Sequence, residues 1–265
     1  MRGTSALNAY ESYAPIYNAF NHQNDYEMWL GRVLLPELGK HGLKGNRALD
    51  VACGTGRAFA PLLRRGWDIR GCDLSPSMLE RAHAEGRGKV ELDVVDMREL
   101  PTYGEFDLVL SLNDSVNYLL GDNDLLDALA CMHANLADGG LVLFDVNSKS
   151  MYEGKEGTWT VGRSHIVEYD GRCWTWRALG EVAPSIFEVR IEGDDVGVIV
   201  HHERFRSQSE VRHALAASGL ECRAVLGMDE SDGEVLLHEP PDEDHHYKVL
   251  YIASRGRVAG EAPDT

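Results

Sequence analysis

Residues 48–57, with the sequence ALDVACGTGR, constrain the fold of this chain more than any other stretch. An apolar segment runs into a turn with two glycines, and a helix is expected over about residues 58–65. Gly54 and Gly56 lack a Cβ atom, so the backbone can adopt positive φ and a ligand can lie directly against it. The first N–H groups of the helix have no partner within the helix. The stretch therefore predicts a buried strand, a ligand-binding turn and a helix.

The turn departs from the pattern of a dinucleotide-binding site. Phe59 stands where G-x-G-x-x-G requires its third glycine, which argues against binding of a pyrophosphate. The next predicted strand, residues 68–73, ends on Asp73, and a carboxylate at that place suits the diol of a ribose. NAD and S-adenosylmethionine (SAM) both contain a ribose, so Asp73 does not distinguish them.

Four segments, in order and at matching spacing, resemble the class I SAM-dependent methyltransferases. They are DVACGTG at 50–56, GCDLSPSML at 71–79, VDM at 95–97 and FDLVL at 106–110. The resemblance covers roughly residues 45–147, and within the class the chain resembles small-molecule N-methyltransferases of the sugar-amine and glycine type. It implies an α/β fold, with a seven-stranded, mostly parallel sheet and helices on both faces.

The resemblance also implies a cofactor site for SAM. Asp73 would accept hydrogen bonds from both ribose hydroxyls, and Asp50 would orient the turn or meet the amino group through water. Asp96 would accept from the adenine amino group, with Met97 lining the ring; helix capping is the alternative role of Asp96. The predicted cofactor-binding residues are Tyr13, Asp50, Ala52, Gly54, Gly56, Asp73, Leu74, Met78, Asp96, Met97 and Asn113.

The acceptor side is less defined. Asp114 would hold an amine, act as a base or cap the next helix, and His201 titrates in the range that suits a base. Arg204 would clamp a carboxylate or phosphate, but alternation along a strand puts it on the face opposite His201. The residues do not decide which of the two faces the pocket. The predicted catalytic residues are His201, Asp114 and Tyr17, and the predicted substrate-binding residues are Tyr17, Tyr118, Asn147 and Arg204.

The pattern of elements divides the chain into successive parts. After a loose start over residues 1–9, SYAPIY and a following Y-x-x-W resemble a lid that folds over SAM. Later runs, beginning at residues 159–161, alternate as in an antiparallel sheet, and Asp170-Gly171 indicates a hairpin turn. The acidic residues 229–246 are expected to form a surface loop. The predicted parts are a helical lid (1–44), a SAM-binding core (45–157), an inserted antiparallel sheet (158–206), completion of the core sheet (207–257) and a tail (258–265).

Composition narrows the range of partners. The net charge of −17, without a basic run, disfavours nucleic acid and anionic membranes. Five widely spaced cysteines without a C-x-x-C pair indicate reduced thiols in the cytoplasm and no structural zinc. The acidic and histidine residues 242–246 are too compact to share one metal ion, so no metal is expected. We expect a small-molecule acceptor and a monomer or homodimer.

The sequence thus predicts a SAM-dependent methyltransferase that acts on an amine or hydroxyl of a small molecule, such as a sugar amine, an amino acid or a secondary metabolite. Two alternatives remain open: an RNA or protein methyltransferase, and a SAM-binding protein without catalysis. A nicotinamide oxidoreductase is disfavoured by Phe59 and by Asp96-Met97.

Overall fold

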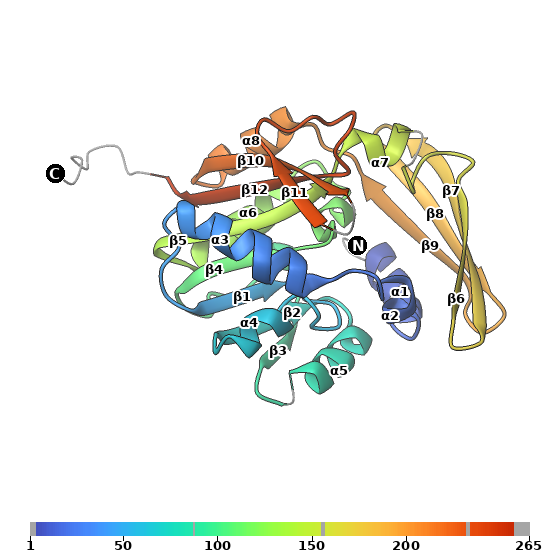
Figure 1. Cartoon of the computed structure of the whole chain (residues 1–265), viewed down its shortest axis with the longest axis horizontal. Helices are drawn as coiled ribbons and strands as arrows, with labels where there is room; N and C mark the ends of the chain where they lie inside the picture. The colour runs from blue at the N-terminus through green and yellow to red at the C-terminus, as the bar shows by residue number, and fades with distance from the viewer. Residues whose placement is uncertain (1–3, 87, 155–156, 232–233, 257–265) are drawn as a thin grey trace.

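The computed structural model describes residues 4–86, 88–154, 157–231 and 234–256. A central sheet carries helices on both faces, and a smaller sheet stands beside it, with α1 and α2 between the two (Figure 1). The helices are α1 (Thr4–Tyr13), α2 (Tyr17–Phe20), the π-helix η1 (Glu27–Leu34), α3 (Leu35–Lys40), α4 (Ala60–Arg64), α5 (Pro76–Glu85), the 3-10 helices η2 (Met97–Glu99) and η3 (Ser115–Tyr118), α6 (Asp124–Ala134), α7 (Lys149–Glu153) and α8 (Gln208–Ala217).

The strands alternate with these helices up to β5, and afterwards α7 and α8 interrupt the run of strands. They are β1 (Arg47–Val51), β2 (Asp68–Asp73), β3 (Glu91–Val94), β4 (Phe106–Ser111), β5 (Leu136–Asn147), β6 (Ser164–Tyr169), β7 (Arg172–Ala183), β8 (Ile186–Gly193), β9 (Gly197–Arg204), β10 (Leu220–Ser231), β11 (Glu234–His238) and β12 (Lys248–Arg255).

The central sheet has the order β11-β10-β12-β5-β4-β1-β2-β3. Strands β1 to β5 pair in parallel, whereas β12, β10 and β11 add antiparallel pairs. This arrangement confirms the expected mostly parallel sheet with helices on both faces. One strand is additional: residues 229–246 were expected to be a loop, but β11 pairs with β10 within them. The loop prediction was wrong there because Val235 and Leu237 alternate as in a strand and pack with Trp29.

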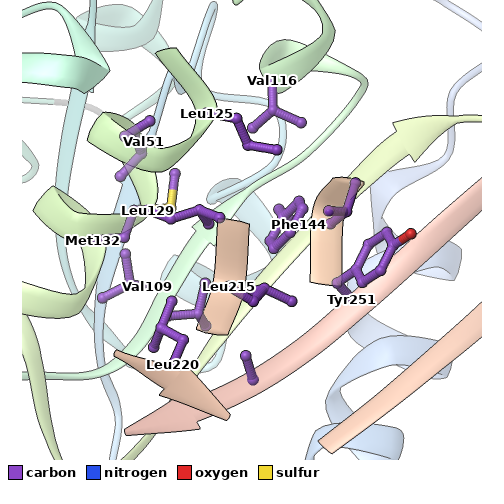
Figure 2. Close-up of a cluster of buried hydrophobic side chains, with 14 of the residues drawn as sticks. Val51, Val109, Val116, Leu125, Leu129, Met132, Phe144, Leu215, Leu220 and Tyr251 are labelled. Carbon is purple, nitrogen blue, oxygen red and sulfur yellow. The ribbon is translucent and has the colours of Figure 1, made fainter. Parts of the chain in front are cut away.

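Both faces of the sheet are covered, which accounts for the continuous apolar runs of its parallel strands. On one face, Val109 and Phe144 of the sheet pack against Leu129 of α6 and Leu215 of α8 (Figure 2). Tyr251 of β12 stacks on Phe144, with ring centroids 5.1 Å apart. The opposite face is covered by apolar side chains of η1, α3, α4 and α5. The sheet is therefore held rigid beneath the polar residues at its carboxyl edge.

The smaller sheet is antiparallel, in the order β6-β7-β8-β9, as the alternating runs predicted. Asp170 and Gly171 have φ of 49° and 72°, and Tyr169 pairs with Arg172 on either side of them. A two-residue hairpin turn of type I′ needs positive φ at both central residues, so the predicted turn is present. Residues 159–161 were predicted to be a strand, but they form a turn. That prediction was wrong because Trp159 turns inward and packs between Tyr152 and Trp176.

The N-terminal segment is helical from Thr4, so residues 4–9 are not loose as expected, and residues 1–3 lie outside the described part. Burial explains the helix, because Ala9 and Tyr13 pack with Trp174 and Ile199 of the smaller sheet. The predicted tail, residues 258–265, also lies outside the described residues. Within the described ranges no helix is long and apolar enough to cross a bilayer. All five cysteines are described, and each is a free thiol.

Candidate functional site

A cavity of about 550 Å³ lies at the carboxyl ends of β1, β2, β3 and β4. It is the place where an open α/β sheet binds its ligand. Of the residues predicted from the sequence, those on its wall are Tyr17, Ala52, Gly54, Asp73, Leu74, Asp96, Met97, Asn113 and Tyr118. Those not on its wall are Tyr13, Asp50, Gly56, Met78, Asp114, Asn147, His201 and Arg204. The cavity therefore brings about half of the predicted residues together, and their roles remain predictions.

The glycine turn presents bare backbone to this cavity. Ala52 and Gly54 have φ of 58° and 56°, and a Cβ on Gly54 would have no neighbour nearer than the Tyr17 hydroxyl at 3.9 Å. Gly56 differs, because a Cβ there would lie 2.5 Å from the ring of Phe59. Phe59 is fully buried, so Gly56 makes room for packing and Gly54 leaves room for a ligand. The residue that replaces a third glycine thus closes the turn from behind.

Asp73 fixes this turn to the next strand. Its Oδ2 accepts from the N–H of Gly54 at 2.8 Å, and its Oδ1 accepts from the N–H of Ser75 at 2.9 Å. Burial raises the pKa of Asp73 to about 6, although these backbone bonds act against the shift. Two of about four acceptor positions on a carboxylate are thereby used. The remaining positions suit the two hydroxyls of a ribose.

Asp50 is the penultimate residue of β1, just before the glycine turn. Its side chain is buried, and neither carboxyl oxygen has a hydrogen-bond partner among the described residues. Burial, with a contribution from the nearby Asp73 charge, raises the pKa of Asp50 well above its usual value. A buried carboxyl group without a partner is costly, and such a group marks a place that a ligand or water completes.

Asp96 lies where adenine is predicted to bind, which we call the nucleoside side of the cavity, and it forms hydrogen bonds with Arg98. Its Oδ1 accepts from the backbone N–H and Nε of Arg98, at 3.0 and 2.9 Å. Burial alone would raise the pKa of Asp96, but the bonds with Arg98 outweigh it and lower that pKa. Arg98 also donates to Asp124 at 2.9 Å. Asp96 caps η2, which is the alternative that the sequence left open, and it still lies on the cavity wall.

Aromatic side chains form another part of the wall, where we expect the acceptor to lie and which we call the acceptor end. Tyr10, Tyr17 and Tyr118 line it, and the rings of Tyr10 and Tyr118 lie 5.1 Å apart. Burial raises the pKa of Tyr17 to about 12, and it also raises the pKa values of Tyr10 and Tyr118 well above the usual range. All three hydroxyls are therefore neutral at physiological pH. They can position a substrate, but they are poor bases.

His201 lies behind this wall. It is 1% exposed, and its Nδ1 is 3.1 Å from the Tyr118 hydroxyl. Burial lowers its pKa to about 3, and its Nε2 has no partner among the described residues. The structure thus places the residue predicted to be a base where it can orient Tyr118 but cannot touch a substrate directly. Sequence reasoning overlooked this because a strand pattern does not reveal what covers its inner face.

Arg204 lies on the other face of β9, as alternation predicted. It donates to the carbonyl oxygen of Leu120 at 3.0 Å and to Asp122 at 2.7 Å. It therefore shapes the loop at the rim and does not enter the cavity. Two other predicted residues that are not on the wall are buried in the protein. Met78 and Tyr13 belong to the same apolar cluster, and the ring of Tyr13 lies 4.9 Å from that of His201.

Asp114 belongs to a buried ionic cluster beneath the acceptor end. Lys248 donates to Asp114 at 2.6 Å and to Asp145 at 2.7 Å. Asp145 also accepts from the backbone N–H groups of Asn113 and Asp114, at 2.6 and 2.8 Å. Asn113 and Asp114 both have positive φ, so the cluster holds a strained turn at the end of β4. Asp114 thereby helps to hold the turn that places Asn113 on the cavity wall.

Glu203 extends this cluster towards the smaller sheet. It is fully buried, and its Oε2 accepts from Asn147 and from the Tyr152 hydroxyl, each at 2.7 Å. Its Oε1 has no partner among the described residues. Burial, followed by the charge of Asp114, raises the pKa of Glu203 well above its usual value. Asn147, predicted to bind substrate, is thus engaged in this buried network.

The N-terminal segment is tied across the cavity at several points. Glu11 of α1 accepts from the hydroxyl of Ser77 at 2.7 Å and from its N–H at 3.1 Å. Thr55 of the glycine turn donates to Asn18 at 3.1 Å. Arg57 donates to backbone carbonyls beyond α2. The segment therefore roofs the site in this structure.

Several residues of the site were not predicted. They are Tyr10, Tyr26, Arg57 and Arg98 on the wall and Asp145, Glu203 and Lys248 behind it. Arg57 directly follows the glycine turn, and Lys248 begins a largely apolar strand. Both positions could therefore have been identified from the sequence as candidates for the site. The others depend on contacts between distant segments.

Comparisons with known proteins agree with this geometry. Residues 48–140 match a family model described as a methyltransferase domain. The chain is 37% identical over 113 residues to a glycine/sarcosine N-methyltransferase of Parasynechococcus marenigrum, covering 41% of this chain and 39% of the relative. It is 27% identical over 199 residues to the dTDP-3-amino-3,6-dideoxy-alpha-D-glucopyranose N,N-dimethyltransferase of Streptomyces fradiae, covering 71% and 75%.

Among solved structures, an S-adenosylmethionine-dependent methyltransferase from Clostridium acetobutylicum superposes with a TM-score of 0.74 at 22% identity, covering 94% of this chain and 100% of that one. This likeness confirms the expected fold. The chain spans little more than half the length of the first curated relatives that it matches.

Proposed function

We propose that this chain, a class I SAM-dependent methyltransferase by family match and fold, transfers a methyl group from SAM to an amine of a small molecule. The observation that carries the proposal is one cavity with two unlike ends. A bare glycine turn and Asp73 form one end, and neutral tyrosine hydroxyls backed by buried carboxyl groups form the other.

The residues present fit the cofactor. Gly54 leaves open space above the turn, Asp73 keeps free acceptor positions, and Asp50 is a buried carboxyl group that still lacks a partner. In this proposal Asp73 holds the ribose, and Asp96 with Met97 holds the adenine. When bound, SAM supplies a methyl group on a positively charged sulfur. The chain's own residues orient the acceptor and keep water away from it.

The charges behind the acceptor end favour an amine over an anionic or neutral acceptor. Asp114 and Asp145 both accept from Lys248, and Glu203 adds a third carboxyl group. Burial raises the pKa of Asp114 and the Lys248 charge opposes that shift. With Asp114 ionised, two carboxylates outweigh one ammonium and the cluster is negative even when Glu203 is protonated. A negative cluster at low dielectric attracts a cationic ligand. The relative from Streptomyces fradiae, whose name gives an amino sugar as its substrate, supports the same choice.

The amine has to lose a proton before its lone pair can attack. The neutral hydroxyls of Tyr10, Tyr17 and Tyr118 accept hydrogen bonds from its N–H groups and aim the lone pair. His201 stays neutral and holds Tyr118. The proton then leaves to water at the rim, where the side chain of Asp122 is exposed. In this scheme the protein acts by orientation and exclusion of water, without a strong base on the wall.

In this proposal each part of the chain has its own role. Residues 1–44 act as a lid, 45–157 bind SAM, 158–206 form an inserted sheet that supports the acceptor side, and 207–257 complete the core. We place the protein in the cytoplasm, where its five thiols stay reduced. It would act as a monomer or homodimer, without nucleic acid or membrane, because its net charge of −17 repels both.

A turnover panel tests the proposal. The protein is incubated with SAM and with amino sugars and small amino acids, each paired with an analogue that carries a hydroxyl in place of the amine. We expect S-adenosylhomocysteine and a methylated product with at least one amine and with none of the hydroxyl analogues. Methylation of hydroxyl analogues alone would overturn the choice of acceptor. SAM binding without turnover on the panel would favour the non-catalytic alternative.

A further inference from the structure

Two arginine residues, Arg57 and Arg98, line the cavity, and Arg57 also borders a second cavity that Asn18 and Asn24 line. Arg98 is neutralised, because Asp96 and Asp124 both accept from it. Arg57 forms no ion pair with any residue in the described ranges; its partners are backbone carbonyls. The wall of the cavity thus holds one positive charge without a carboxylate, at the glycine turn.

Arg57 is held firmly in this position. It donates to the carbonyl oxygen of Asn21 and, at 2.8 Å, to that of Asn24, both just beyond α2. Its guanidinium carbon lies 5.6 Å from the centre of the Tyr26 ring, within the range of a cation–π contact. A guanidinium has five N–H groups, so these two bonds leave donors free. A donor group that is positioned in advance loses little entropy when it binds an anion.

Electrostatics decide where an anionic part of a ligand would lie in this cavity. Asp73 and Asp96 make the nucleoside side negative, and the buried cluster of Asp114 and Asp145 makes the acceptor end negative. A carboxylate is repelled from both ends. Arg57 beside the turn is the position on the described wall where its charge is compensated.

We propose that Arg57 binds the carboxylate of the methionine part of SAM, an inference that rests on the proposed function. Because Arg57 also holds residues 21 and 24, the same side chain joins the cofactor to the N-terminal lid. Binding of the carboxylate would then strengthen the closed position of that segment. Arg57 is a cofactor-binding residue in this scheme and has no part in proton transfer.

The test pairs one ligand change with one protein change. Calorimetric affinities of S-adenosylhomocysteine and of its decarboxylated analogue are measured for the wild type and for Arg57→Met. A charge-assisted bond of about 1.5–3 kcal/mol corresponds to about 10- to 100-fold in affinity, so the wild type should prefer S-adenosylhomocysteine by that factor. In Arg57→Met this preference should fall to about twofold, because the partner of the carboxylate is gone.

Two further variants separate binding from folding. Arg57→Lys keeps the charge and should retain part of the preference even if Arg57→Met unfolds. Arg64→Met removes an exposed arginine that pairs with Glu27 and should leave both affinities unchanged. Equal weakening of both ligands in the Arg57 variants would overturn the inference and give Arg57 a purely structural role in the lid. Failure of the wild type to bind either ligand would instead contradict the proposed cofactor.

Discussion

The two ends of the cavity are built in different ways. At the cofactor end, the turn at residues 52–58, Asp73 and residues 96–98 each follow a strand of the parallel sheet within a few positions. At the acceptor end, Tyr118 meets His201 across 83 positions of sequence, and Lys248 meets Asp114 across 134. One end is thus a set of local turns on a shared scaffold, and the other exists only when distant segments assemble. Changes at the two ends should therefore affect different properties.

The largest effect is expected for Lys248→Met. The change leaves the buried Asp145 and the partly buried Asp114 without their cation, and breaking a buried ion pair in this way costs about 3–5 kcal/mol of unfolding free energy. Urea unfolding measures the loss. Lys149→Met is the matched control, because Lys149 pairs with Asp244 at the surface and should not matter.

The same variant has a pH signature. Burial raises the pKa of Asp114 and the Lys248 charge opposes that shift, so without Lys248 the folded state binds a proton at Asp114 more tightly than the unfolded state does. The deficit relative to wild type should then shrink as the pH falls from 8 to 5. A deficit that is constant over this range would mean that lost packing, and not unpaired charge, causes it.

Asp73→Ala should have the next largest effect, and at the opposite end. Loss of two charge-assisted bonds to a ribose, about 1.5 kcal/mol each, predicts about 100-fold weaker binding of SAM. Asp68→Ala, at the exposed start of the same strand, should bind SAM as the wild type does. Near-normal affinity of Asp73→Ala in calorimetry would place the ribose elsewhere.

Tyr118→Phe should have a smaller and selective effect. It removes one neutral hydrogen bond of about 1 kcal/mol, so we expect KM for the amine to rise about fivefold. The affinity for SAM should stay within about twofold, because Tyr118 lies at the acceptor end. Tyr169→Phe, on the outer edge of the smaller sheet, is the control. If SAM binding weakened as much as acceptor binding, the two ends would not be separable.

The smallest effect concerns His201. With a pKa of about 3 it is neutral throughout pH 5–8 and should add no inflection to the profile of kcat/KM. The rate should rise with pH as the amine loses its proton, and a less basic amine should shift this rise to lower pH. An inflection near pH 6.5 that persists with every acceptor and disappears in His201→Asn would restore His201 as the base.

The difference between the ends also explains what the sequence could predict. The cofactor end could be predicted because each of its segments combines an apolar run with a polar residue at its end, as in the strand that ends at Asp73. The parallel sheet and the hairpin at Asp170-Gly171 followed from similarly local signals. Gly56 was assigned to the ligand from its spacing, whereas the structure shows it against Phe59.

The acceptor end could not be predicted from such local patterns. The titration range of a free histidine suggested a base at His201, but burial among side chains of α1 and the smaller sheet lowers its pKa. Asp114 carried no sign that Lys248 would neutralise it, because the two meet only after β12 inserts beside β5. The strand β11 was missed since its apolar run, residues 235–237, is short and lies within an acidic segment.

The measurement that tests the central claim most directly is isothermal titration of the full chain with SAM and, in parallel, with NADH. The account predicts micromolar affinity for SAM and no binding of NADH, because the turn lacks the third glycine of a dinucleotide site. Binding of NADH, or binding of neither ligand, would contradict it.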